Sequence, residues 1–132
     1  MILVRAPLRI SFVGGGTDLP DFYTHYPGRV LSVTINKYVY VAINETPLID
    51  RLTAKYSKTE SVTHPAHLEH PSIREALLHL GITRKGIEIG SFTDLPSKTG
   101  LGSSSSFAVA LMKGLHTLLA KKMNAEEAAR AA

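Results

Sequence analysis

Glycine and hydroxyl-bearing residues gather between positions 99 and 106, where Thr99 and two glycines on either side of Leu101 are followed by four serines. Gly100 and Gly102 allow the backbone to approach a ligand closely or to adopt a positive φ angle. The serines open an amphipathic helix, whose unpaired N–H groups and positive dipole end attract a phosphate group. Their hydroxyls add donors and a candidate Mg²⁺ ligand. This stretch therefore predicts a phosphate-binding loop at a helix start.

A flexible linker is the alternative, because runs of Gly and Ser are common in linkers and Ser is an ordinary helix cap. Composition alone favours the linker. The flanking sequence favours the loop, since a strand-like segment at 86–95 precedes it and apolar residues follow it at helical spacing. The Walker pattern is absent, because Lys98 precedes the glycines and no Gly-Lys-Ser/Thr follows them.

A second glycine-rich turn, residues 14–16, follows the first strand-like segment and precedes Thr17 and Asp18. The Asp18 carboxylate could accept hydrogen bonds from sugar hydroxyls, or it could cap the short helix expected near residues 21–23. The local sequence by itself favours the cap.

Both glycine motifs resemble signatures of the GHMP kinases, the family of galactokinase, homoserine kinase, mevalonate kinase and phosphomevalonate kinase. Residues 96–104, Pro-x-x-x-Gly-Leu-Gly-Ser-Ser, are similar to the second motif, although Ser105 and Ser106 stand where the family usually has Ala-Ala. The resemblance implies ATP and Mg²⁺ as cofactors, with Ser104 beside the metal. The residues implied in ATP binding are Pro96, Lys98, Thr99, Gly100, Leu101, Gly102, Ser103, Ser104 and Ser105.

Residues 5–18 resemble the first, substrate-side motif of the family. The resemblance implies that Arg9 reaches the reacting groups as a catalytic residue. It also implies a sugar-binding set made of Gly14, Gly15, Gly16, Thr17 and Asp18. The sequence Gly-Gly-Gly-Thr-Asp-Leu-Pro and residues 31–41 are similar to kinases of D-glycero-D-manno-heptose 7-phosphate.

The function implied is ATP-dependent phosphoryl transfer to a hydroxyl of a sugar or sugar phosphate, with the heptose 7-phosphate as the expected acceptor. Other acceptors of the family, such as fucose, galactose or mevalonate, remain alternatives. A non-catalytic RNA-binding module of the same fold is the rival from another class. The net charge of +4 arises without a dense cluster of Lys and Arg, so no nucleic-acid partner is expected.

Composition places the chain among cytoplasmic globular proteins. It has 132 residues, 44% of them hydrophobic, and no cysteine for disulfides or metal sites. No apolar run approaches the roughly 18 residues of a membrane span. Neither a membrane nor a nucleic acid is an expected partner, and a homo-oligomer is left open.

The pattern of elements predicts an α+β domain whose strands carry helices on one side. We expect strands at 2–13, 29–44, 52–56 and 86–95, and helices at 72–80, from 103 to about 123, and from 124 onward. Ser72 and Glu75 have capping-box spacing, and Lys37 on the apolar parity of its strand favours an edge position. The segment 57–70 reads as an irregular loop.

His64, His67 and His70 are three residues apart, but neighbouring prolines and the lack of a second ligand cluster make a loop near the nucleotide a better interpretation than a metal site. The resemblance implies the N-terminal domain of a GHMP kinase, a fold shared with a ribosomal-protein domain. The final helix has no stop signal, so we expect residues 1–132 to be a truncated domain that lacks the C-terminal domain, and with it the catalytic base and the acidic metal ligand.

Overall fold

The computed structural model describes residues 1–96 and 99–132. Its elements, in chain order, are β1 (Ile2–Val13), α1 (Pro20–Tyr23), β2 (Leu31–Glu45), β3 (Leu52–Lys55), β4 (Thr59–Val62), the 3₁₀ turn η1 (Pro65–His67), α2 (Pro71–His79), β5 (Ile87–Thr93), α3 (Ser103–Leu118) and α4 (Ala125–Ala131). None of the helices in these ranges combines the length and apolar composition that a bilayer span requires.

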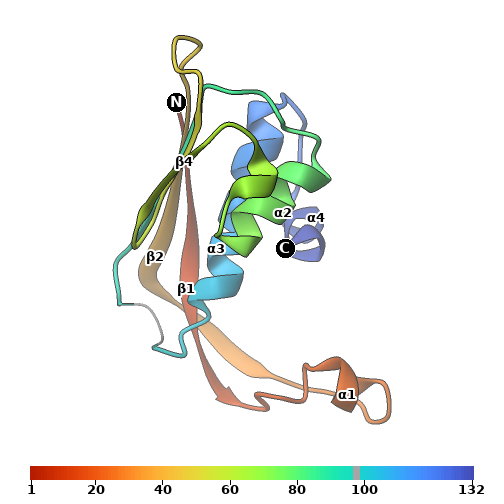
Figure 1. The fold of residues 1–132 in the computed structure, drawn as a ribbon. Coiled ribbons are helices and arrows are strands. Elements are labelled where there is room, and N and C mark those ends of the chain that lie inside the picture. The colour runs from red at the N-terminus through yellow and green to blue at the C-terminus, as the bar shows by residue number, and fades with distance from the viewer. Residues whose placement is uncertain (97–98) are drawn as a thin grey trace.

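The five strands form one sheet in the order β1-β2-β5-β3-β4. All neighbours are antiparallel except β3 and β5, which run parallel. The helices α2, α3 and α4 lie on one face of this sheet (Figure 1). The predicted α+β class with helices on one side of the strands is therefore confirmed.

The core lies between the sheet and the helical layer. Val41 and Ile43 of β2 and Ile89 of β5 point inward and are at most 1% exposed, which matches the alternation of the sequence. Gly114 of α3 faces this layer, and a β-carbon there would lie 2.8 Å from Cδ1 of Ile43. A larger residue at position 114 would therefore require the Ile43 side chain to move.

The C-terminal end of β1 and the N-terminal end of β2 extend beyond the rest of the sheet. Together they form a two-stranded arm that carries α1 (Figure 1). Thr17 closes the arm, because its hydroxyl donates to the Gly14 carbonyl at 2.7 Å and accepts from the Arg29 N–H at 3.1 Å. The two sides lie so close that a β-carbon on Gly14 would be 1.9 Å from the Arg29 carbonyl oxygen. The backbone of the arm therefore requires glycine at position 14.

Several local predictions are wrong. Asp18 does not cap α1, whose N-cap is Leu19 without a side-chain hydrogen bond. The segment 57–70 contains the strand β4, because Thr59 to Val62 pair with β3. Lys37, by contrast, lies within a register shift between β1 and β2 and precedes residues 39–45, the part of β2 that pairs with β5, so its expected edge position is not contradicted.

The helix ends differ as well. His70 caps α2, accepting at Nδ1 from the Ile73 N–H at 3.4 Å, in place of the expected Ser72–Glu75 capping box. Helix α3 ends at Leu118, earlier than predicted. The capping box at Asn124 and Glu127 is present as expected.

Candidate nucleotide site

The start of α3 is open to a ligand. Gly102 is its N-cap, with φ of 71°, and offers no side chain to the first-turn N–H groups. The carbonyl of Gly102 accepts the Ser106 N–H and the Ser105 hydroxyl, each at 3.0 Å. The N–H groups of the first turn therefore lack a side-chain cap, and they lie at the positive end of the helix dipole.

The glycine loop is attached to β1 by three contacts. The Arg9 N–H donates to the Leu101 carbonyl at 3.1 Å, and the Ser106 hydroxyl donates to the Pro7 carbonyl at 2.9 Å. A β-carbon on Gly102 would lie 3.1 Å from Cγ and from Nε of Arg9. The structure thus brings Arg9, from the first sequence motif, against the loop of the second.

Arg9 keeps its guanidinium near the loop surface. Its Nη1 donates to the Ser11 hydroxyl at 3.1 Å, two residues along β1. A guanidinium retains several other donors after one such bond, and it stays charged at every relevant pH. This position suits the binding of a phosphate held at the start of α3.

The predicted sugar-binding residues lie elsewhere. Residues 14–18 belong to the arm, which projects away from the helical layer in Figure 1. The Asp18 carboxylate accepts from the Gly16 N–H at 3.0 Å, and the Thr17 hydroxyl bonds to the backbone across the arm. Asp18 retains its second carboxylate oxygen for a ligand, while Thr17 has a structural role.

A cavity of about 710 Å³ adjoins the helix start, and we call it the Ser104 cavity. Its lining includes hydroxyls of β5 and α3 together with three rings. These residues include Thr93, Ser103, Ser104, Tyr56, His70 and Phe107. Its volume is that of a site for a small-molecule ligand.

The sequence does not reveal most of this cavity. The expectation of a histidine loop near the nucleotide agrees with the position of His70 in the cavity lining. No sequence pattern predicted that Tyr56 and Phe107 would line the same cavity. Tyr56 follows β3, while Phe107 reads simply as a core residue of an amphipathic helix. Ser97 and the predicted ATP-binding residue Lys98 lie outside the described residues.

Glu60 supports the rings of the cavity. Its carboxylate accepts from the Tyr56 hydroxyl at 2.6 Å, from the Glu69 N–H at 2.6 Å and from the His70 N–H at 3.2 Å. The Tyr56 hydrogen bond lowers the pKa of Glu60 against the effect of burial. Burial and the neighbouring Glu60 raise the pKa of Tyr56 to about 12, and burial lowers the pKa of His70.

The histidines do not form a metal site. Within residues 1–96 and 99–132, no group of three or more His, Asp or Glu side chains is placed to hold a metal ion. His64 and His70 use Nδ1 to accept from the backbone N–H groups of Ala66 and Ile73. The described lining of the Ser104 cavity contains no carboxylate, so the Ser104 hydroxyl could be only one ligand of a Mg²⁺ ion held mainly by phosphates.

Comparison with known proteins agrees with this geometry. The family model described as GHMP kinases N terminal domain matches residues 71–132, which contain the glycine loop and α3. Over these residues the chain is similar to the N-terminal domain of the GHMP kinases. Among solved structures, a D-glycero-D-manno-heptose 1-phosphate kinase from Bacteroides thetaiotaomicron is similar over 98% of this chain and 46% of its own, with a TM-score of 0.84 and 26% identity.

Two curated proteins are similar to this chain in sequence. The D-glycero-alpha-D-manno-heptose 7-phosphate kinase of Campylobacter jejuni is 28% identical over 85% of the chain and 36% of its own length. The bifunctional fucokinase/GDP-fucose pyrophosphorylase of Arabidopsis thaliana is also 28% identical, over 85% of the chain and 12% of its own. The chain therefore spans well under half the length of either relative.

Proposed function

We propose that this chain serves ATP-dependent phosphoryl transfer to a hydroxyl of a sugar or sugar phosphate, with D-glycero-D-manno-heptose 7-phosphate as the acceptor. The observation that carries the proposal is the contact of Arg9 with the uncapped start of α3, next to the Ser104 cavity. The heptose phosphates in the names of two relatives support the choice of acceptor.

In this proposal the donor phosphates lie at residues 99–105, where first-turn N–H groups and the hydroxyls of Ser103 and Ser104 donate hydrogen bonds. The Ser104 cavity takes the nucleoside end of ATP. Arg9 stabilises the charge that develops on the transferred phosphoryl group, a role that needs positioning more than covalent chemistry. Mg²⁺, when bound at Ser104 and the phosphates, neutralises part of the same charge.

The acceptor approaches from the arm. Arg9 and residues 14–18 lie on one continuous strand and turn, so a sugar bound by Asp18 would approach the phosphates along β1. The transfer needs a proton acceptor for the attacking hydroxyl, and we assign that role to residues beyond 1–132. The limited share of each relative that the chain spans supports this division.

An ADP-release assay on the full-length protein tests the proposal, with heptose 7-phosphate, galactose, fucose and mevalonate as acceptors. We expect turnover near or above about 1 per second only with the heptose phosphate. Turnover with another acceptor would correct the substrate. No ATP binding and no turnover with any acceptor would overturn the proposed function.

A further inference from the structure

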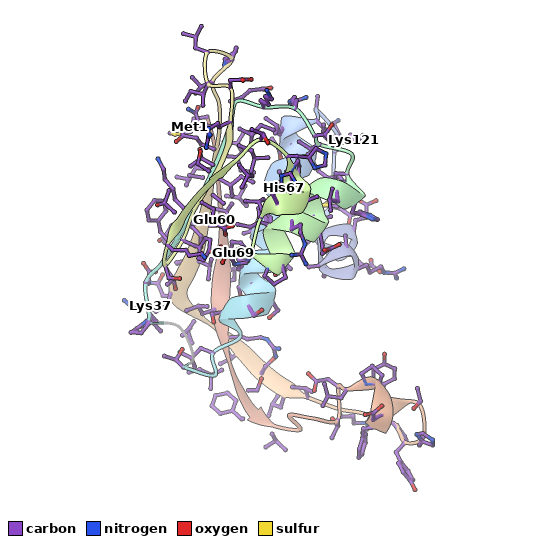
Figure 2. All side chains as sticks on the ribbon, in the orientation of Figure 1. Met1, Lys37, Glu60, His67, Glu69 and Lys121 are labelled. Atoms are coloured by element: carbon purple, nitrogen blue, oxygen red, sulfur yellow. The ribbon has the colours of Figure 1, made fainter. Side chains whose placement is uncertain are left out.

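The carboxylate of Glu60 is buried behind the residues that line the Ser104 cavity. Glu60 is only 7% exposed and lies in β4, next to Glu69 in Figure 2. Burying a carboxylate is costly unless hydrogen bonds replace its water. Here three donors do so: the Tyr56 hydroxyl and the N–H groups of Glu69 and His70.

Glu60 fixes two chain segments that are distant in sequence. One is the turn after β3 that carries Tyr56, and the other is the turn before α2 that carries His70. The rings of Tyr56 and His70 meet edge to face with centroids 4.7 Å apart, and the His70 ring lies 5.3 Å from that of Phe107 on α3. All three rings line the cavity beside Ser103 and Ser104.

His70 is held from its other side as well. Its Nδ1 accepts from the Ile73 N–H, so the neutral ring carries its proton on Nε2. With its backbone N–H on Glu60 and its ring between Tyr56 and Phe107, the imidazole has little freedom to turn. Two of these contacts involve the Glu60 carboxylate, which accepts from the His70 N–H and from the hydroxyl of the adjoining Tyr56.

We propose that Glu60 is a positioning residue for nucleotide binding, which holds Tyr56 and His70 in the wall of the Ser104 cavity. The proposal rests on the proposed function, because it takes the cavity to hold the nucleoside end of ATP. Glu60 itself touches no ligand. Its loss disturbs the wall of rings while leaving the glycine loop, which is anchored on β1, in place.

The test compares ATP with inorganic tripolyphosphate, which offers phosphates but no nucleoside. Calorimetric titration of the full-length Glu60→Gln variant should show the Kd for ATP raised about tenfold, the effect of roughly one charged hydrogen bond. The Kd for tripolyphosphate should stay within about twofold of the unsubstituted protein. A residue that only stabilised the fold would change both constants or neither.

Tyr56→Phe keeps the ring and the two backbone bonds of Glu60 but removes the hydroxyl. We expect Tyr56→Phe to raise the Kd for ATP about threefold. If Glu60→Gln does not fold, Tyr56→Phe alone tests the positioning role of Glu60. Glu75→Gln is the matched control, because Glu75 lies on α2, accepts from Arg74 and, among the residues that the structure describes, is not part of the cavity lining. It should leave both constants unchanged.

The two proposals fail differently. If the unsubstituted protein binds neither ATP nor tripolyphosphate, the nucleotide site itself is wrong. If ATP binds normally and both Glu60→Gln and Tyr56→Phe retain its Kd, the positioning role of Glu60 is overturned while the proposed function stands. Equal weakening of ATP and tripolyphosphate in Tyr56→Phe would also overturn it, since the loop would then be affected.

Discussion

The side chain of Arg9 in β1 packs against Gly102 at the start of α3, so that a β-carbon on Gly102 would lie 3.1 Å from Cγ and Nε of Arg9. The absence of a side chain at residue 102 is what lets Cγ and Nε of Arg9 come so close. Gly102 also has a φ of +71°, which other L-residues adopt only with strain. Gly102 therefore allows both the left-handed backbone of the loop and the close approach of the Arg9 side chain.

Substitution at this glycine separates the two effects. Gly102→Ala should cost about 1–2 kcal/mol of stability from the left-handed backbone, and should also displace Arg9 and lower kcat/KM for ATP at least tenfold. Gly81→Ala is the matched control, since φ is +66° there and a β-carbon would meet nothing within 4 Å. Urea unfolding and ADP-release kinetics on both variants give the comparison, and equal kinetics would remove Arg9 from the site.

Ser104→Ala and Ser105→Ala should differ, although both serines were predicted to bind ATP. Ser104 lines the cavity, whereas the Ser105 hydroxyl is already bonded to the Gly102 carbonyl. We expect Ser104→Ala to lower kcat/KM by about a hundredfold, as loss of a charge-stabilising donor does, and Ser105→Ala by less than about threefold. Steady-state kinetics at several Mg²⁺ concentrations measure both, and similar values would contradict the assignment of Ser104.

Asp18→Asn tests the acceptor side. The amide oxygen of Asn can accept from the Gly16 N–H as the carboxylate does, so the unfolding free energy should change by less than about 0.5 kcal/mol. The acceptor KM should rise and kcat should fall, while the Kd for ATP stays constant. Normal kinetics in a stable variant would exclude Asp18 from sugar binding.

Ser106→Ala probes the bond that attaches α3 to β1. Removing the hydroxyl leaves the Pro7 carbonyl without its side-chain donor, at a cost of about 1 kcal/mol. Alanine is what the resemblance leads one to expect here, so activity should persist. Thermal unfolding gives the stability change, and a loss below about 0.3 kcal/mol would show that the bond contributes little.

The lowered pKa of His70 predicts a loss of stability in mild acid. Because the unfolded chain binds the proton more tightly, the stability is complete above the ordinary pKa of 6.5 and falls as the pH drops from there through the lower folded value. Glu60 adds a further loss below 4.5, where its unfolded form takes up a proton first.

His70→Asn should remove the first of these losses, since Asn also caps a helix but does not titrate. Urea unfolding of the two proteins between pH 8 and 5 makes the comparison. An unchanged pH profile in the variant would assign the acid sensitivity to other groups.

The sequence predicted the class of fold for physical reasons. Strict alternation in residues 39–43 leaves little choice of which face is buried. The helix start at Ser103 was predictable because apolar residues follow it at helical spacing, while the role of its loop in phosphate binding stays a prediction. The contact between Arg9 and Gly102 required the resemblance to place both in one site. No local pattern joins residues more than 90 positions apart.

Side-chain chemistry at segment ends was the least predictable part. Ser72 and Glu75 have ideal capping-box spacing, but His70 and Pro71 begin the helix one residue earlier. Glu60 looked like one more charge in a polar loop, because its three donors come from residues 4, 9 and 10 positions away. Strand β4 has only four residues, and its buried side chain is a carboxylate, so its sequence shows too little alternation of apolar and polar residues to predict a strand.

The central place of β5 in the sheet governs the order in which the chain can assemble. Its neighbours are β2 and β3, both of which precede it in sequence by at least 30 residues. Until residues 87–93 leave the ribosome, the hairpins β1–β2 and β3–β4 each present an open edge that can pair with another chain. Such long-range strand insertion is slow compared with local hairpin closure. A chaperone that covers strand edges would therefore act on this protein before its fifth strand is synthesised.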